Sequence, residues 1–506
     1  MSFKKNIFSN YCSSIYTILI NIAIVPFYLQ YMGATAFGLI GVYTVMQSWL
    51  SLLNMGLTPA LSREVACCRD QKNGLSQVRP LLRSLEIIFL MINLFIISAV
   101  ILNSHWLAHH WLKISNLSYT QVMYCISLMG IIAACRWFAD LYRSAISSVE
   151  KQVWLNGTNI ILATLRYGGS YVLLRWITRI PTHFFEYQLL IAIAEPVVLG
   201  KKFYKILSPK TNHFFNFTIS WKLIFKIFPF ASGLFYTTII YIFLSQSDKL
   251  ILSHILSLTT YGYFSLVVII SGGMLQCAMP VYLALLPRMT HLLSQEKKIE
   301  MLQMYRKATQ LITVIMFPLI GIIAIFSAPI IYIWTGNIVA ANWAGPILFW
   351  YVLGNGFFVM SAFEFYLQFA CGSIKLHVIF DTLFALVYFP LILFSADHYG
   401  AMGTAITWFV MQGLLFFILP AIVHHKYAPG MHQKWLLEDI FPILITAVVM
   451  LLLLRKIPVH FELISRIDGF LIVSSMTVFL VVICAFSSNV CRDLLLTLIQ
   501  RRKISI

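Results

Sequence analysis

Charged side chains are scarce in this sequence of 506 residues: they make up 11% of it, whereas hydrophobic residues make up 60%. Ordinary soluble domains carry about 25% charged residues. No interval between the apolar runs exceeds roughly 25 residues, which leaves no room for a separate soluble domain. The sequence therefore predicts an all-α polytopic membrane protein.

Acidic residues are especially few, with 18 of them against 36 lysines and arginines, which gives a net charge of +18. Such an excess can indicate nucleic-acid binding. Here the basic residues lie beside apolar segments, where retention at an anionic inner leaflet explains them better. We therefore expect the lipid bilayer as a partner and no nucleic acid.

Patterns typical of enzymes and metal sites are also missing. None of the nine cysteines has metal-ligand spacing, and no paired nucleophile and base or phosphate-binding Gly-rich loop is present. His105 and His109 are four residues apart without an acidic partner, and the neighbouring Trp106 and Trp111 favour an interfacial aromatic belt over a metal site. We expect no catalytic residue, no metal and no cofactor, and hence no enzyme.

The chain does contain roughly fourteen apolar segments of membrane-spanning length. Their approximate spans are 11–31, 37–59, 85–108, 121–142, 156–177, 183–200, 223–247, 261–286, 311–334, 345–371, 376–395, 400–423, 438–455 and 467–487. The thirteenth is the weakest, because charged residues crowd a short apolar stretch. Residues 1–10 lead directly into the first span without a small-residue cleavage site, so we expect a membrane helix there and not a removed signal peptide.

Most basic residues lie on one side of the predicted membrane, because they are concentrated in every second connection between the spans. About 27 lie in even-numbered connections and the termini, about 7 in odd-numbered connections and about 2 within helices. Positive charge is retained in the cytoplasm during insertion. Both termini are therefore predicted to be cytoplasmic, together with the connections Arg63–Arg83, Arg143–Lys151, Lys201–Lys226 and Arg288–Lys307.

A pattern near the second span recurs near the eighth. Phe37-Gly38 is followed by Arg63, and Tyr261-Gly262 is followed by Arg288, so the offsets are 224 (262 minus 38) and 225 (288 minus 63). A displacement of six helices preserves orientation, which predicts two parallel six-helix lobes, 1–205 and 206–425, and two additional helices in 426–506. The alternative is coincidence, because such residues are common at helix ends.

Several short patterns resemble the Wzx-type polysaccharide flippases. In the first half they are Ser9-Asn10, Pro26-Phe27-Tyr28-Leu29, Gly33, Phe37-Gly38, Leu52–Leu57 and Arg63-Glu64. In the second half they are Asp248-Lys249, Tyr261–Ser265 and Gly400–Ala405. The patterns are loose, touch most of the chain and are strongest over residues 1–70 and 229–290.

This resemblance implies membership of the multidrug/oligosaccharidyl-lipid/polysaccharide (MOP) exporter superfamily. It implies alternating access by two six-helix bundles in the bacterial inner membrane. The implied substrate is an oligosaccharide on undecaprenyl diphosphate, moved to the periplasmic leaflet for O-antigen or capsule assembly. A polysaccharide polymerase and a chain-length regulator are the implied protein partners.

Ionisable residues within the spans are the candidate site residues, because charge in the membrane is costly and usually functional. Arg136, Asp140 and Arg143 share one helical face. Arg136 either pairs with Asp140 or lines a cavity, and Arg166 either pairs across helices or binds an anionic substrate. Both arginines can form bidentate contacts with phosphate.

Polar residues of the first two spans, Asn21, Gln47 and Asn54, contact either sugar hydroxyls or neighbouring helices. Asp248 and Lys249 form either an interfacial ion pair or a gate, and we expect them to find different partners because adjacent side chains point about 100° apart.

Two acids of the second half, Glu364 and Asp381, flank a short connection, which predicts that they lie near one another. Each is a candidate for carrying H⁺ or Na⁺ in coupled transport, or for pairing with Lys375 or another helix. Glu195-Pro196 is expected to mark a kink.

A cation-coupled drug exporter of the same superfamily is the alternative function. It would favour carboxylates in the first lobe, whereas the charge there leans positive.

Overall fold

The computed structural model describes residues 3–68, 74–207, 220–457 and 459–492. Within these ranges the chain is helical, with no strand beyond an isolated bridge between Lys113 and Ser257. The predicted all-α class is confirmed. Parts of two predicted basic connections, 69–73 and 208–219, and the predicted cytoplasmic termini, 1–2 and 493–506, lie outside the described residues.

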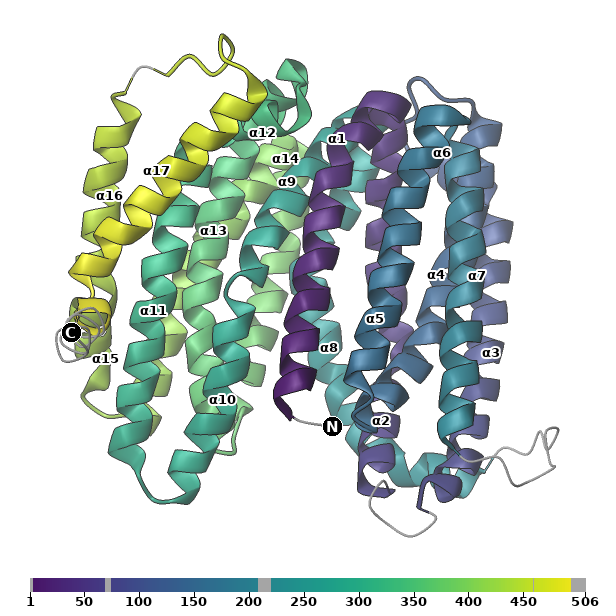
Figure 1. Ribbon diagram of the computed structural model, residues 1–506, viewed down its shortest axis with the longest axis horizontal. Coiled ribbons are helices and arrows are strands. Elements are labelled where there is room, and N and C mark those ends of the chain that lie inside the picture. Colours follow the sequence, from purple (N-terminus) through teal and green to yellow (C-terminus); the bar gives the residue numbers. More distant parts are fainter. Residues whose placement is uncertain (1–2, 69–73, 208–219, 458, 493–506) are drawn as a thin grey trace, which may run out of the picture. The chain divides into compact units, whose positions relative to one another are not determined.

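Two compact units divide the chain, and each is described by itself. Unit 1 comprises Met1–Gly262. Its elements (Figure 1) are α1 (Phe3–Leu50), η1 (Ser51–Asn54), α2 (Leu57–Cys68), α3 (Gly74–Trp106), η2 (Leu107–Trp111), α4 (Tyr119–Ser148), α5 (Gln152–Ala163), η3 (Thr164–Gly169), α6 (Ser170–Trp176), α7 (Pro181–Ile206), α8 (Trp221–Ile255) and the start of α9 (Leu258–Gln276).

Unit 2 comprises Tyr263–Ile506 and begins within α9. Its remaining elements are α10 (Met279–Ser294), α11 (Lys298–Ile325), α12 (Ser327–Thr335), α13 (Ile338–Ala370), α14 (Lys375–Tyr427), α15 (Met431–Lys434), η4 (Trp435–Ile440), α16 (Phe441–Arg455) and α17 (Arg466–Ser487). The division into lobes at residues 205 and 425 stays a prediction.

Glycines break two of the long helices. Gly33 has φ 82° within α1, and Gly400 has φ 58° within α14. Non-glycine residues rarely adopt these left-handed values. The breaks lie between the first and second predicted spans and at the start of the twelfth. The second predicted span, 37–59, is too long, because α1 ends at Leu50 and α2 begins only at Leu57.

Nine helical stretches of the described chain are long and apolar enough to cross a membrane. Two of them, Phe8–Asn54 and Lys375–Tyr427, contain the glycine breaks. Each therefore comprises two consecutive helical segments. The full count of fourteen crossings stays a prediction.

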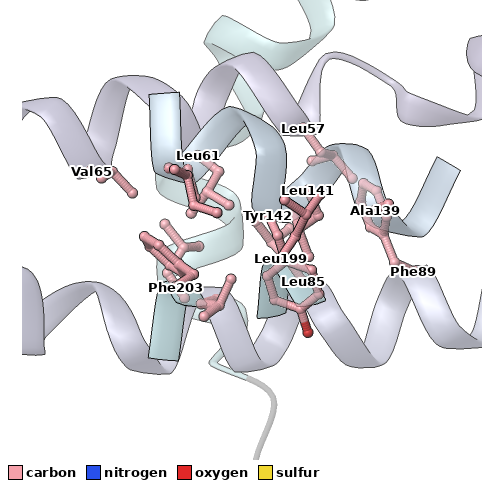
Figure 2. Packing of buried hydrophobic residues seen from close by; sticks show 14 of the residues in the cluster. Leu57, Leu61, Val65, Leu85, Phe89, Ala139, Leu141, Tyr142, Leu199 and Phe203 are labelled. Carbon is pink, nitrogen blue, oxygen red and sulfur yellow. The ribbon is translucent and has the colours of Figure 1, made fainter. Parts of the chain in front are cut away.

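The core of unit 1 lies where α2, α3, α4 and α7 meet. Figure 2 shows Leu61 of α2, Leu85 of α3 and Phe203 of α7 among its buried side chains. The rings of Phe89 and Trp137 stack at 4.1 Å. Since lipid is as apolar as these side chains, close packing holds the helices together in the membrane, rather than removal from water. The core thus fixes α4 against α7, which carry the candidate site.

A close helix crossing joins the two segments of the predicted repeat. A Cβ added to Gly38 would lie 2.1 Å from the carbonyl oxygen of Leu258, and one added to Gly262 would lie 2.3 Å from that of Ala34. Both distances are too short for a side chain. Glycine at both positions is therefore what lets α1 and α9 approach so closely.

A buried carboxylate anchors the C-terminal helices of unit 2. Asp439 of η4 is fully buried and accepts hydrogen bonds from Arg306 Nε and Gln310 Nε2 of α11, both at 2.6 Å. Gln310 Oε1 in turn accepts from Ser488 Oγ, just after α17, at 2.8 Å. One polar network therefore joins both ends of the α16–α17 pair to α11.

Candidate functional site

The cationic cluster consists of Arg136, Asp140 and Arg143 of α4, Arg166 of η3 and Glu195 of α7. Helices α4 and α7 pack against each other and run in the same direction, because Arg136 contacts Gln188 and Arg143 contacts Glu195 at the same offset of 52 residues. Two turns separate the contacts on each helix. This register brings one polar face of each helix together.

Glu195 is the counter-ion of the cluster, with only 2% of its side chain exposed. Its carboxylate accepts hydrogen bonds from Arg143 and, at 2.8 Å, from Arg166 Nη2. Of the two alternatives for Arg166, the structure shows the pair across helices. Reading Glu195 only as the mark of a kink before Pro196 was incomplete, because the sequence does not reveal which helix lies opposite.

Arg136 does not pair with Asp140, the acid of its own helix face. Its Nη2 donates to Gln188 Oε1 at 3.1 Å, and its guanidinium lies 5.3 Å from the ring centroid of Tyr43 in α1. Asp140 instead pairs with Arg143. Of the two alternatives for Arg136, the pair with Asp140 is not formed, because α7 and α1 offer Arg136 other partners.

Arg166 lies on a wider helical turn, the π-helix η3. Such turns disturb the normal backbone ladder and are frequent at functional sites. Side chains of α7 form hydrogen bonds to two backbone carbonyls of η3: Tyr187 Oη donates to Leu165 O at 2.8 Å, and Gln188 Nε2 donates to Arg166 O at 3.0 Å. Helix α7 thus fixes both the backbone and the charge of this segment.

The cluster carries a surplus of one positive charge, from three arginines and two carboxylates. The exposed fractions of the Asp140 and Arg143 side chains are 47% and 35%. Charge against lipid is costly, so these faces must adjoin water or the membrane interface. The Nε atoms of Arg136 and Arg166 are buried and have no hydrogen-bond partner within the described chain. An anion can therefore reach only the exposed parts of the cluster, not these two buried atoms.

The three polar candidates of the first two spans, Asn21, Gln47 and Asn54, form no hydrogen bond with the cluster in the described chain. Asn21 and Gln47 are half-buried on α1. Asn54 Oδ1 accepts from the backbone N of Thr58 at 3.1 Å and from its hydroxyl, so this amide caps the first turn of α2. Their role toward a sugar stays a prediction.

Asp248 and Lys249 lie inside α8, which continues to Ile255, and not at its end. Lys249 Nζ is 3.2 Å from Asp248 Oδ1 and also donates to the carbonyl of Ser245. The expectation of different partners is wrong for this contact. The long lysine side chain turns back across the angle between adjacent residues.

In unit 2 the structure brings Glu364 and Asp381 together through His377. His377 Nδ1 is 2.9 Å from Glu364 Oε1, and Nε2 is 3.2 Å from Asp381 Oδ2. Gln368 Nε2 donates to Glu364, and Gln368 Oε1 accepts from the backbone N of His377 at 3.1 Å.

Sequence reasoning missed Glu195, Gln188 and His377 as site residues. The spacing of His377 and Asp381, at i and i+4 on one helix, was a usable signal. Gln188 and Glu195 at i and i+7 on α7 were another. Within the described chain no group of three His, Cys, Asp or Glu residues is arranged to hold a metal ion.

Unit 2 also has an apolar pocket of about 390 Å³ between α11, α13, α14 and α16. Phe317, Phe357, Phe416 and Leu451 are among its lining residues. Its surface suits alkyl or isoprenoid chains and offers almost nothing to a charged group.

Residues 3–293, more than half of the chain, match a family model described as polysaccharide biosynthesis protein. The chain belongs to this family. A protein of Shigella flexneri named "Putative O-antigen transporter" is 22% identical over 418 residues, which are 81% of this chain and 94% of the relative. The resemblance found in the sequence is thereby confirmed, and the protein is a multi-pass membrane transporter and not an enzyme.

Solved structures show the same fold. The lipid II flippase MurJ, in an inward closed conformation, has a TM-score of 0.70 at 16% identity, covering 96% of this chain and 99% of that chain. An inward-facing multidrug resistance MATE family transporter of the MOP superfamily has a TM-score of 0.61 at 14% identity, covering 80% and 94%. The fold is therefore that of the MOP superfamily.

Proposed function

We propose that the protein moves undecaprenyl-diphosphate-linked oligosaccharide repeat units from the cytoplasmic to the periplasmic leaflet, for O-antigen or capsule assembly. The observation that carries this proposal is the cationic cluster within a member of the polysaccharide biosynthesis family. A pyrophosphate needs cations and hydrogen-bond donors in a wet environment, because bare hydrocarbon would strip its hydration.

Glu195 holds Arg143 and Arg166 in place without cancelling the cluster's charge. Arg136 is held by a neutral amide and an aromatic ring, so its full charge remains. A net excess of carboxylates would favour an organic cation instead. The surplus of one cation therefore supports an anionic headgroup over the substrate of a drug exporter.

Alternating access is the proposed mechanism, with the headgroup in the protein and the isoprenoid tail remaining in lipid. The bacterial inner membrane and cytoplasmic termini are part of the same proposal. The proposed functional partners are the polymerase and the chain-length regulator, which would act on the delivered repeat units. Asp248 and Lys249 are proposed to act in gating, and Glu364 and Asp381 in coupling.

Deletion of the gene tests the proposal. The deletion strain should lose surface polysaccharide and accumulate lipid-linked repeat units, and a plasmid copy should restore both. Unchanged polysaccharide together with new sensitivity to organic cations would favour the drug exporter. Neighbouring genes for glycosyltransferases and sugar-nucleotide enzymes would provide independent support.

A further inference from the structure

We infer that Glu364, His377 and Asp381 form a single proton-exchange site whose occupancy controls the contact between the end of α13 and the start of α14. This inference deepens the proposed function by naming the coupling ion and by adding His377 as the central residue. It rests on the proposed function only where transport is the readout.

The position of the imidazole carries the inference. Both ring nitrogens of His377 face carboxylate oxygens, at 2.9 Å and 3.2 Å. A neutral imidazole has one N–H and one lone pair, whereas an imidazolium has two N–H groups. With neutral His377 and two carboxylates, one lone pair would face an anionic oxygen. Both contacts are attractive only when the site holds one more proton.

The number of protons at this site is important because the site is largely buried, where uncompensated charge is costly. The Glu364 side chain is 2% exposed, whereas those of His377 and Asp381 are 27% and 20% exposed. Two carboxylates beside a neutral ring would leave two negative charges there, and the added proton reduces them to one. Since Glu364 is buried and Asp381 partly exposed, a proton can reach the site from the Asp381 side.

The site also joins two helices. Glu364 belongs to α13, and His377 and Asp381 belong to α14, across a connection of four residues. Gln368 holds the end of α13 and the start of α14 together, because its amide donates to Glu364 and accepts from the His377 backbone. The ring of Phe365 lies 4.7 Å from that of His377. Loss of the proton would therefore weaken one particular contact between α13 and α14.

Within the described chain, Glu364 and Asp381 are the charged groups that contact His377. Tyr305 of α11 packs against the same end of α13, with its ring 5.7 Å from that of Phe363. Its hydroxyl pairs with His424 Nε2 at 2.8 Å and is thus already engaged. In the described chain no lysine or arginine forms an ion pair with Glu364 or Asp381, so a proton is the available source of positive charge.

The geometry favours a proton over Na⁺. Sodium, a hard cation, prefers several converging oxygen ligands. Here an imidazole stands between the two carboxylates, with a hydrogen bond between Nδ1 and Glu364 Oε1 and with Nε2 3.2 Å from Asp381 Oδ2. Removing the ring without replacing its two nitrogens should therefore abolish coupling, even with both carboxylates retained.

The first test needs no transport. Nitrogen-15 spectra of histidine-labelled protein in detergent, with the His377 signals identified by their loss in His377→Gln, should show both ring nitrogens protonated near neutral pH. Between about pH 5 and 9, the signals of both His377 ring nitrogens should change together in a single step. A neutral ring with an unprotonated nitrogen throughout this range, beside two ionised carboxylates, would overturn the inference.

The second test uses vesicles containing the full protein and undecaprenyl-diphosphate-linked oligosaccharide. For one proton per substrate, each unit of pH gradient should shift the steady-state leaflet distribution about tenfold. His377→Gln should abolish the shift, whereas His398→Gln, an exposed histidine of the same helix, should retain it. A response to a Na⁺ gradient alone, or a retained pH response in His377→Gln, would overturn the inference. Absence of any translocation by the wild type would overturn the proposed function, while the spectra still decide the proton site.

Discussion

The hydroxyl oxygens of Thr35 and Thr259 lie 2.8 Å apart, and the two residues are 224 positions apart in the chain. The same offset separates Gly38 from Gly262 and Ala34 from Leu258. Gly38 approaches Leu258 and Gly262 approaches Ala34, so the contact is reciprocal. Reciprocal contacts are expected where a two-fold axis passes between related segments. Such a crossing is what the predicted repeat would produce, and the repeat itself stays a prediction.

If transport uses alternating access, this close crossing is a natural point of separation. Thr35→Cys combined with Thr259→Cys should form a disulfide on oxidation, because the replaced hydroxyls already touch. Oxidised double-variant protein should lose polysaccharide export, and a reductant should restore it. Electrophoretic mobility and surface polysaccharide provide the measurements.

Each single variant is the matched control, since the chain has nine native cysteines. Single variants should show no oxidation-dependent loss. Normal export by fully cross-linked double variant would show that this crossing stays closed throughout the cycle.

Arg136→Ala and Arg166→Ala should each reduce export about tenfold or more, because a hydrogen bond to a charged group contributes about 1.5–3 kcal/mol. Membrane insertion should be retained. Arg175→Ala is the control, because Arg175 is exposed and contacts Tyr171 and Trp176 of its own helix. Wild-type levels of surface polysaccharide in both cluster variants would refute the role of these cations.

Glu195→Gln should lower the free energy of unfolding by about 3 kcal/mol, because it leaves Arg143 and Arg166 facing a neutral amide. Reversible unfolding in mixed micelles measures the change. Glu186→Gln, on the same helix, loses only a partly exposed contact with Tyr124 and should cost less than about 1 kcal/mol. Equal stabilities of the two variants would show that Glu195 is not the counter-ion.

Adjacent acids of η4 give a second paired comparison. Asp439→Ala should destabilise unit 2 by about 3 kcal/mol, because Asp439 is fully buried between Arg306 and Gln310. Glu438→Ala should cost less than about 1 kcal/mol, since the Glu438 side chain is 52% exposed. A larger effect at Glu438 would contradict the proposed anchor of α16 and α17.

Hydropathy predicted much of the fold, because lipid requires long apolar helices and this requirement acts locally. The turns at Gly33 and Gly400 were found only in the structure. The end of α1 at Leu50 was missed, since the following residues remain apolar up to Asn54 although the backbone there has left the α-helical form. Composition alone does not distinguish an apolar turn from a helix.

The candidate site was predictable only in part. Arg136, Asp140 and Arg143 share a face by periodicity, but their actual partners belong to other helices. Glu195 could be identified as the counter-ion only once α7 was known to lie against α4. Glu364 and Asp381 were expected to be neighbours because their connection is short. The ring of His377 between them depends on side-chain geometry that spacing does not specify.

The most direct measurement is translocation in vesicles by the purified protein. A labelled undecaprenyl-diphosphate-linked oligosaccharide is placed in one leaflet, and its appearance in the other is followed with a glycosidase that cannot cross the membrane. The account predicts that the wild-type protein moves the substrate, that Arg166→Ala slows it, and that Arg175→Ala does not. Retention of the substrate in its original leaflet, together with transport of an organic cation by the same vesicles, would contradict the account.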